Sequence, residues 1–549
     1  MDSKSAISAV LRATTLDSLR MTDIHDVIVV GAGAAGGLAA MLLAESGMRV
    51  LLLDASLPST LLRAPLRRLG GRLYRRLSTP GALGRFPPTF IPKARDALKV
   101  LGQKRQPVQS QCYAWGGAPN AFVDDLDCPY TTAPDHPFVW IRSRILGGRV
   151  AVPGHGRQYY RLGPDDFNPR DGLSTPWPLQ PNELDTWYAL VEHRLGLSGM
   201  RDELPWLPDC ELLHLLTPTQ SEAALRDKII ARWAGARPIL SRYAPPLDAL
   251  EVAARTGRLQ CRQGAVAREV CVDDSGRVCG VVWTDHRTKS ERRSSAPLVF
   301  LCASALESTR LLMLSRSQRS PKGLGAASGV LGSYLMDHVI VSAEGFGPER
   351  FGASLTEEGR CIYLPRFDAR ASSPPKSVRG YGAQVYQIPV GRGRSYFVAF
   401  AFAEMLPRLE NRVTLDPNRR DAWGIPVLRI DCAHSDVELS RARDQTQALH
   451  ELAELAEVAL IRIDELPRPP GSAIHECGTA RMGTEPATSV LDANNQCWDA
   501  RGLYVTDGAC FPSQGSQNPT LTILALTARA CHHALGSMGR GLLADRQMA

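Results

Sequence analysis

The sequence has no long apolar run. No stretch approaches the roughly 18 consecutive apolar residues of a membrane span. The first 21 residues also lack the apolar core of an export signal and a twin-arginine pair. These absences argue against a transmembrane segment and a secretory signal. We therefore expect a cytoplasmic protein in which residues 1–21 are an N-terminal extension.

Closely paired cysteines are absent as well. The thirteen cysteines are scattered and odd in number, and no two are spaced as CxxC. This pattern argues against a disulfide framework, a zinc site and a haem-attachment motif. We expect reduced thiols and no metal.

Acidic residues are nearly missing from one stretch, residues 55–110. It holds twelve Lys and Arg but a single acid, Asp96, whereas the formal net charge of the whole chain is +8. Few aromatic residues lie among these cations, so nucleic-acid binding has little support. The interleaved leucines and arginines allow contact with a membrane surface or an acidic partner. Because Pro65, Gly70 and Gly71 interrupt any long helix, a solvated flap is the favoured interpretation.

What the chain does have, at 549 residues, is enough length for two large domains and an ordinary globular composition with 44% hydrophobic residues. Helices and strands alternate in the first half and strands dominate later. This pattern predicts an α/β fold, in which a parallel-sheet nucleotide domain is interleaved with a second domain built on a mainly antiparallel sheet. The boundaries that we expect are 22–165, 250–335 and 473–541 for the first domain, and 166–249 and 336–472 for the second.

A glycine-rich fingerprint follows the first buried strand, Val27 to Val30. It reads Gly31-x-Gly33-x-x-Gly36, leads into an Ala/Leu-rich helix, and is followed by a second strand ending in Asp54. Such glycines allow a tight turn, the close approach of a pyrophosphate and close helix packing, and the acid can bind ribose hydroxyls. The fingerprint predicts dinucleotide binding, but it does not choose between FAD and NAD.

Several further elements are expected from periodicity and turn signals. The pattern predicts helices over 180–235, 303–314 and 435–460, strands over 298–301, 395–402 and 411–415, and a hairpin over 266–283 around an Asp-Ser-Gly turn. Residues 107–167 are rich in Gly, Pro, Asp and Asn, which is typical of a long loop lining a site, with loop packing between domains as the alternative. Within this loop, Gly147-Gly148 would let the backbone lie against a flat ring.

The C-terminal stretch 474–533 contains three features that a redox site needs. His475 opens a Gly/Thr-rich turn, a short buried strand ends at Asp507-Gly508, and Asn518-Pro519-Thr520 precedes an apolar run. We expect Asn518 to cap this helix, whose N-terminus would stabilise an anionic cofactor atom. Each feature alone is equally compatible with a structural role; their combination favours a site.

Together, the fingerprint, the Gly147-Gly148 loop and the block with His475 and Asn518 resemble the glucose–methanol–choline (GMC) oxidoreductases, which bind FAD. The likeness extends over nearly the whole chain beyond residue 24. It is strongest toward the bacterial sugar and glycoside dehydrogenase branch, in the segments PVQSQCYA, MLPRLENRVTLDP, HECGTARMGTEPATSVLD and QNPTLTILALTARA.

The resemblance implies a Rossmann-like FAD domain, an α+β substrate domain and an alcohol-oxidising mechanism. His475 matches the family's catalytic histidine and would accept the hydroxyl proton while hydride passes to flavin N5, and Asn518 would hydrogen-bond the developing alkoxide. The FAD contacts expected from the fingerprint and the resemblance are Gly31, Gly33, Ala34, Ala35, Gly36, Asp54, Gly147, Gly148, Val266, Asp507, Gly508, Ala509, Pro519 and Thr520.

Some positions depart from the family pattern. Val152 stands where certain members attach FAD through a histidine, so we expect non-covalent FAD. Pro153 replaces a residue that is usually aromatic in the sugar branch, and Asp54 replaces the commoner Glu. His155 and Glu404 are candidate auxiliary groups, although a loop histidine and a strand-end carboxylate are the favoured interpretations.

These observations leave several functions open. The leading hypothesis is FAD-dependent oxidation of a sugar, glycoside or polyol hydroxyl. Alternatives are oxidation of a non-sugar alcohol in a specialised pathway, a redox-silent hydroxynitrile-lyase type of flavoprotein, and a flavin-binding protein whose basic flap docks a partner. The electron acceptor, whether oxygen, a quinone or a protein, is not determined by the sequence.

Overall fold

The computed structural model describes residues 25–57, 104–169, 171–348, 359–367, 379–391 and 393–542. The expected N-terminal extension and most of the basic flap lie outside the described residues. Among the residues that are described, no helix is both long and apolar enough to cross a membrane. None of the thirteen cysteines forms a disulfide.

The first part of the architecture is a five-stranded, entirely parallel sheet. Its strands come from the beginning, the middle and the end of the chain. In sheet order they are β19 (Leu503–Val505), β11 (Val299–Leu301), β1 (Val27–Val30), β2 (Val50–Asp54) and β7 (Leu259–Gln263). The residues of β19, β11 and β1, and those of β2 before Asp54, are buried Val, Leu, Ile or aromatic side chains, as expected of a sheet covered on both faces, whereas edge strand β7 is mostly polar and half-buried.

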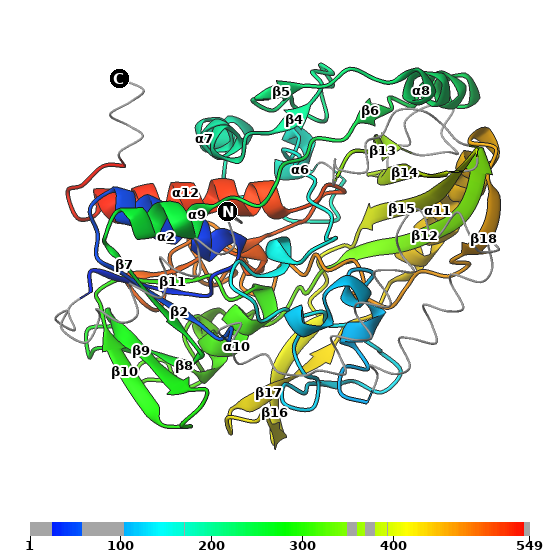
Figure 1. Ribbon diagram of the computed structural model, residues 1–549. Helices are drawn as coiled ribbons and strands as arrows, with labels where there is room; N and C mark the ends of the chain where they lie inside the picture. Colours follow the sequence, from blue (N-terminus) through cyan, green and yellow to red (C-terminus); the bar gives the residue numbers. More distant parts are fainter. Residues whose placement is uncertain are drawn as a thin grey trace.

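Helices cover one face of this sheet and a small antiparallel sheet lies on the other side (Figure 1). The helices are α2 (Ala34–Glu45), α9 (Ala249–Arg255) and α12 (Thr520–Gly536). The small sheet consists of β8 (Ala265–Val272), β9 (Val278–Asp285) and β10 (Glu291–Ser295), and α10 (Ala305–Leu314) packs against β8. The β8–β9 hairpin turns at Gly276, which has φ +81°, and this confirms the expected Asp-Ser-Gly turn.

The second part is a six-stranded, entirely antiparallel sheet (Figure 1). In sheet order its strands are β18 (Ala459–Ile463), β12 (His338–Pro348), β15 (Arg394–Glu404), β14 (Tyr381–Gly391), β13 (Ile362–Phe367) and β6 (Ile239–Leu240). Helix α11 (Asp436–Leu455) packs on β12 and β15, and its first turn is closed by a capping box between Ser435 and Glu438. The main hydrophobic core includes residues of both large sheets, so the two are joined by apolar packing.

The remaining elements are short. Helix α7 (Asp185–Leu195) contacts α12, and α8 (Gln220–Arg232) contacts α11. Strands β16 (Arg412–Arg420), β17 (Pro426–Asp431) and β3 (Thr131–Thr132) form one small sheet, and β4 (Ser198–Gly199) and β5 (His214–Leu215) another. As expected, residues 107–167 form a long loop, which contains short 3-10 turns, the two-residue strand β3 and the one-turn helix α6 (Pro164–Phe167).

Two helix predictions were too long. The helix expected over 180–235 is interrupted between α7 and α8, because Gly196 ends α7 in a left-handed conformation and the next segment contains Pro205 and Pro208. The helix expected to reach residue 460 ends at Leu455, and the chain continues into edge strand β18. The coarse fold class, α/β with a parallel and an antiparallel sheet, is confirmed; the domain boundaries stay predictions.

Candidate active site

The glycine-rich turn between β1 and α2 has three glycines with different surroundings. Gly31 has φ +97°, and an added Cβ would lie 2.5 Å from the carbonyl oxygen of Cys302. A Cβ on Gly36 would lie 1.8 Å from the carbonyl oxygen of Gly31, so Gly36 lets the helix pack onto the turn. A Cβ on Gly33 would meet nothing within 4 Å. Gly33 therefore faces open space, which a ligand can approach closely.

The Gly147-Gly148 loop lies directly on this turn. The Gly147 amide donates to the carbonyl oxygen of Ala32 at 3.1 Å, and a Cβ on Gly148 would lie 2.8 Å from Cα of Gly33. Asp54, at the end of β2, reaches the same place, because its Oδ2 accepts from the Ala32 amide at 2.7 Å. Segments more than ninety positions apart therefore meet at the fingerprint.

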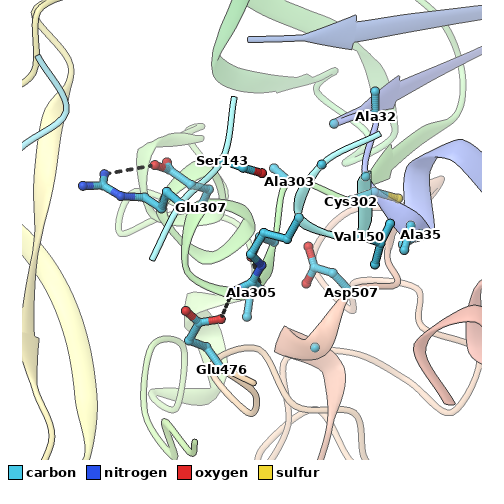
Figure 2. Close-up of a pocket in the computed structure, with 18 of the residues that line it drawn as sticks. Ala32, Ala35, Ser143, Val150, Cys302, Ala303, Ala305, Glu307, Glu476 and Asp507 are labelled. Carbon is cyan, nitrogen blue, oxygen red and sulfur yellow. Dashed lines mark hydrogen bonds and ion pairs between the residues drawn. The ribbon is translucent and has the colours of Figure 1, made fainter. Parts of the chain in front are cut away.

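A single cleft extends from the fingerprint to the C-terminal block (Figure 2). Figure 2 shows Ala32 and Ala35 beside Cys302 and Ala303, with Glu476 and Asp507 approaching from other segments. Of the sequence-predicted residues, those that line the cleft are Gly31, Gly33, Ala34, Ala35, Asp54, Gly148, Val266, His475, Asp507, Gly508, Asn518, Pro519 and Thr520. Gly36, Gly147 and Ala509 are not part of its lining.

Three helices direct their N-termini into the cleft. The first residues of α2, α10 and α12 line it, and no side chain at their N-caps bonds to the backbone of the first turn. The free N–H groups and the helix dipoles favour negative charge. Only α10 carries an acid in its first turn, Glu307. The cleft is thus built to receive an anionic ligand.

His475 and Asn518 meet at the other end of the cleft. The Asn518 Nδ2 lies 3.3 Å from the His475 Nε2, although 43 positions separate the two residues. The prediction that Asn518 caps α12 was wrong, because Pro519 occupies the N-cap and α12 begins at Thr520. The Asn518 Oδ1 instead accepts from the Gln384 Nε2 at 2.9 Å. Its amide is therefore free of the helix and faces His475.

His338 is a site residue that the sequence did not indicate. Met336 and Cys477 form an antiparallel bridge, and the same register places His338 opposite His475. The two Nδ1 atoms lie 2.9 Å apart, and the His338 Nε2 lies 2.9 Å from the carbonyl oxygen of Gly515. A histidine at the start of a buried strand has no sequence signal for such a contact, because the contact depends on pairing across 137 positions.

Burial keeps the histidines of this region uncharged at neutral pH. The pKa of His475 is lowered well below its usual value by burial, and positive charge on His338 or Arg149 would lower it further. Burial also lowers the pKa of His338 and of His155 to about 4. A neutral imidazole has a free nitrogen lone pair, so His475 is in the form that a general base requires.

Arg149 and Glu476 form a buried ion pair in the cleft wall that the sequence reasoning also missed. The Arg149 guanidinium lies 2.7 Å from Glu476 Oε2 and donates to the Ser304 Oγ at 3.2 Å. Ser304 itself has φ +80°, a strained backbone conformation for a non-glycine residue. Asp507 accepts from the Ser308 Oγ at 2.5 Å, and burial raises its pKa to about 6.

The remaining predicted positions are placed as follows. His155 lines the cleft, whereas Glu404 lies outside the lining, where it accepts from the Gln514 amide at 3.2 Å and forms an ion pair with Arg379. This supports the structural interpretation of Glu404. Val152 is fully buried beside the glycine loop, in an apolar cluster with Ile474.

The cleft fits a dinucleotide cofactor. Among the described residues, the buried Ser143 Oγ, His155 Nε2 and Glu476 Oε1 line the cleft region without a hydrogen-bond partner. A buried polar group without a partner costs about 1–3 kcal/mol, so these atoms are suited to a polar ligand. With the open space at Gly33 and the three helix N-termini, they match the needs of phosphates and hydroxyls.

Comparisons with known proteins give this chain a family. Residues 407–527 match the family model described as GMC oxidoreductase. A 2-methyl-1,2-propanediol dehydrogenase of Mycolicibacterium austroafricanum is 31% identical over 76% of this chain and 84% of the relative. A paromamine 6'-oxidase of Streptomyces fradiae is 27% identical over 94% of this chain and 92% of the relative.

A solved structure supports the fold. Pyridoxine 4-oxidase from Mesorbium loti superposes with a TM-score of 0.57 at 19% sequence identity, over 93% of this chain and 99% of the other. The level of identity to the diol dehydrogenase, over most of both chains, extends the likeness from fold to family. The chain belongs to the GMC oxidoreductase family of enzymes.

Proposed function

We propose that the protein is an FAD-dependent enzyme that oxidises a CH–OH group of a sugar, a glycoside or a related polyol. The observation that carries the proposal is the pairing of a neutral His475 with the Asn518 amide in the same cleft as the dinucleotide fingerprint. Members of the GMC family generally depend on FAD. The two ends of the cleft thus supply a cofactor site and a pair of groups suited to an alcohol.

The residues that would hold FAD divide along the cleft. The turn from Gly31 to Gly36 would receive the pyrophosphate, and Asp54 would bind the ribose hydroxyls of the adenosine half. Val266 lines the cleft near this end, and Asp507 and Gly508 would hold the ribityl and phosphate part. Gly148, Pro519 and Thr520 would lie against the remainder of the cofactor, whereas Gly147 and Ala509, which do not line the cleft, would support their neighbours.

In the proposed mechanism, His475 Nε2 accepts the proton of the substrate hydroxyl. The Asn518 Nδ2 donates a hydrogen bond to the same oxygen and stabilises the negative charge that develops on it. FAD bound in the cleft would supply the hydride acceptor, its N5 atom. With one proton taken by His475 and one hydride by that acceptor, the alcohol would leave as a carbonyl product.

The walls beside this pair support a substrate with several hydroxyls. Gln158 lines the cleft and is joined by hydrogen bonds to Tyr386 and through it to Gln384, which lie behind the lining. The Tyr113 ring lies 5.5 Å from the ring of the lining residue His155 and 6.1 Å from that of Phe400. Amide and hydroxyl groups suit the edges of a polyol, and aromatic rings suit its apolar faces. A non-sugar alcohol is the second candidate, because one relative is named as a diol dehydrogenase.

The test is anaerobic mixing of the purified holoenzyme with a panel of sugars, glycosides, diols and simple alcohols. We expect the flavin absorbance to bleach with at least one of them. His475→Ala should slow bleaching about 10²- to 10⁴-fold, the range that a general base contributes. Bleaching as fast as in the wild type would refute His475 as the base.

The same experiment distinguishes the other candidates. A hydroxynitrile-lyase type of protein would convert a cyanohydrin while its flavin stayed oxidised. A flavin protein with only a docking role would show neither reaction. Reoxidation of the bleached enzyme by air, a quinone or a dye would then identify the class of electron acceptor.

A further inference from the structure

A carbonyl oxygen determines which nitrogen of His338 carries hydrogen. The Gly515 carbonyl oxygen can only accept, so the His338 Nε2 at 2.9 Å must donate to it. His338 is 1% exposed and is held neutral at pH 7 by its burial. A neutral imidazole carries one hydrogen, which leaves the His338 Nδ1 as a bare acceptor.

The tautomer of His475 follows from that of His338. Their Nδ1 atoms are 2.9 Å apart, and two bare nitrogens at this distance would repel each other. The His475 Nδ1 must therefore carry hydrogen and donate to His338. In neutral His475 the Nε2 is then the bare nitrogen, and this is the atom that faces Asn518.

A second carbonyl oxygen, that of Gly359, sets the direction of the hydrogen bonds that lead to Asn518. The Gly359 carbonyl oxygen accepts from the Gln158 Nε2 at 3.1 Å, and the same amide group donates to the Tyr386 hydroxyl. The Tyr386 hydroxyl, which is also bonded to the Cys361 thiol, donates its own hydrogen onward to the Gln384 Oε1 at 3.3 Å. The orientation of Gln384 is fixed in this way, with its NH₂ group directed away from Tyr386.

The last link orients Asn518. The Gln384 NH₂ donates to the Asn518 Oδ1 at 2.9 Å, so the Asn518 NH₂ faces the His475 Nε2. In the series of hydrogen bonds from Gln158 to His338, each residue thus donates to the next one. Its 3.3 Å link between Asn518 and His475 is long for a hydrogen bond, so a substrate hydroxyl can replace it.

We propose that this hydrogen-bonded chain, anchored at the carbonyls of Gly359 and Gly515, presets the catalytic pair, with His338 as the positioning residue that selects the His475 tautomer. A hydroxyl entering between the pair would donate to the bare Nε2 and accept from the Asn518 amide without any side chain turning over. This inference rests on the proposed function, because it assigns His338 a role only through His475.

Two substitutions of His338 separate this role from a structural one. Asn places its Oδ1 where the histidine has Nδ1, so His338→Asn keeps the acceptor for His475 and loses the donor to Gly515. His338→Gln places its amide end near the position of Nε2, so it keeps a group near Gly515 and loses the acceptor. We expect His338→Asn to reduce the flavin within about 5-fold of the wild-type rate. His338→Gln should be slower by roughly 10²- to 10⁴-fold, since a base in the wrong tautomer loses most of its effect.

Flavin content and thermal unfolding show whether each variant folds, and substrate affinity in the reductive reaction should change little. If the two variants slow the reaction equally, or if His338→Gln matches the wild type, the tautomer role is wrong. The double variant His338→Gln with His475→Ala should be no slower than His475→Ala alone, because His338 acts through His475. A further loss in the double variant would contradict the proposal.

A spectroscopic measurement tests the tautomer without turnover. The chain has twelve histidines, and comparison with His475→Ala assigns the His475 ring in ¹⁵N spectra of histidine-labelled holoenzyme. We expect a protonated Nδ1 and a bare Nε2 in the wild type and in His338→Asn, and loss of this state in His338→Gln. The opposite tautomer in the wild type would refute the proposal. If no alcohol of the panel reduced the wild-type flavin, the proposed function would fail instead, whatever tautomer was observed.

Discussion

Among the residues of the fingerprint, Gly33 has the clearest individual role. Gly31 and Gly36 are required by the protein itself, because a Cβ on either would collide with backbone at 2.5 Å or less. A Cβ on Gly33 would enter empty space in the cleft, and its φ of −75° is accessible to any residue. We therefore infer that the fold does not require a glycine at position 33 and that a bound ligand does.

Gly33→Ala should fold normally and lose FAD. We expect the apoprotein to melt within about 2 °C of the wild-type apoprotein, a change of under about 1 kcal/mol, while FAD affinity falls roughly 10- to 100-fold. The flavin-to-protein ratio after purification and a titration of the apoprotein with FAD measure the loss. Gly37→Ala, further along α2, is the matched control, because its Cβ would make an ordinary 3.6 Å contact with Ala249 of α9 and leave FAD binding unchanged. Equal FAD affinity in both variants would contradict this role for Gly33.

At the scale of elements, the site depends on the pairing of two short extended segments. Met336 pairs with Cys477 by two backbone hydrogen bonds, and the carboxylate of Asp337 accepts from the amides of Ala473 and His475. This places the start of β12 against the segment that carries the base. Asp337 is fully buried, and its burial, together with the charge of Glu476, raises its pKa to about 7.

The raised pKa of Asp337 gives a pH-dependent stability with a definite sign. An unfolded Asp titrates near 4, so between about pH 4 and 7 the folded protein holds the proton more tightly than the unfolded chain does. The contribution of Asp337 to the free energy of unfolding is fully present below about pH 4. It is lost as the pH rises from there through about 7. The neutral Asp337→Asn should therefore gain stability relative to the wild type over pH 5–7, by at most about 1.4 kcal/mol per pH unit, and level off above.

Thermal unfolding of the two proteins across pH 5–8 measures this difference. Asp273→Asn is the control, since Asp273 lies in the exposed β8–β9 turn and its hydrogen bond from Ser275 lowers its pKa. The difference in unfolding temperature between Asp273→Asn and the wild type should stay constant over the same pH range. Parallel curves for Asp337→Asn and the wild type would show that Asp337 does not titrate in this window.

At the scale of the whole molecule, the cleft joins parts that are far apart in the sequence. Its walls come from the first strand and helix of the parallel sheet, the long loop 107–167, α10, and the C-terminal block. In the sequence, the lining residues extend from Val30 to Ile523, so a ligand that filled the cleft would contact both ends of the part of the chain that the structure describes. FAD bound to the folded protein alone would stabilise the whole arrangement.

We expect FAD to be non-covalent, because Val152 stands at the attachment position and is fully buried. Acid precipitation should release the flavin into the supernatant. Removal of FAD should lower the unfolding temperature by several degrees, since a ligand at a thousand times its Kd contributes about 4 kcal/mol. Fluorescent flavin that stayed on the denatured chain would refute this, and His155, which lines the cleft with a free Nε2, would be the first residue to examine.

Individual strands, helices and turns could be predicted from the sequence because the patterns that indicate them span only a few residues. The expected strands Val27–Val30 and 298–301, the helix before residue 314, and the turn at Gly276 are all present within one or two residues. Gly196 and the nearby prolines also lie in the sequence, and they account for the interruption of the helix expected over 180–235, one of the two helices predicted too long. Hydrophobic period, glycine and proline act over a few residues, so each is readable without the fold.

By itself, the sequence determined the fingerprint, the parallel and antiparallel parts, and the two residues His475 and Asn518 that the proposed chemistry uses. Only the tertiary structure decided which way their side chains face. Asn518 does not cap α12 and faces His475 instead, because Gln384, on a strand 134 positions away, donates a hydrogen bond to its side-chain carbonyl oxygen. His338 reached His475 through an antiparallel register between distant segments. Hydrogen-bond direction depends on the partners that packing brings together, and that information is absent from any local pattern.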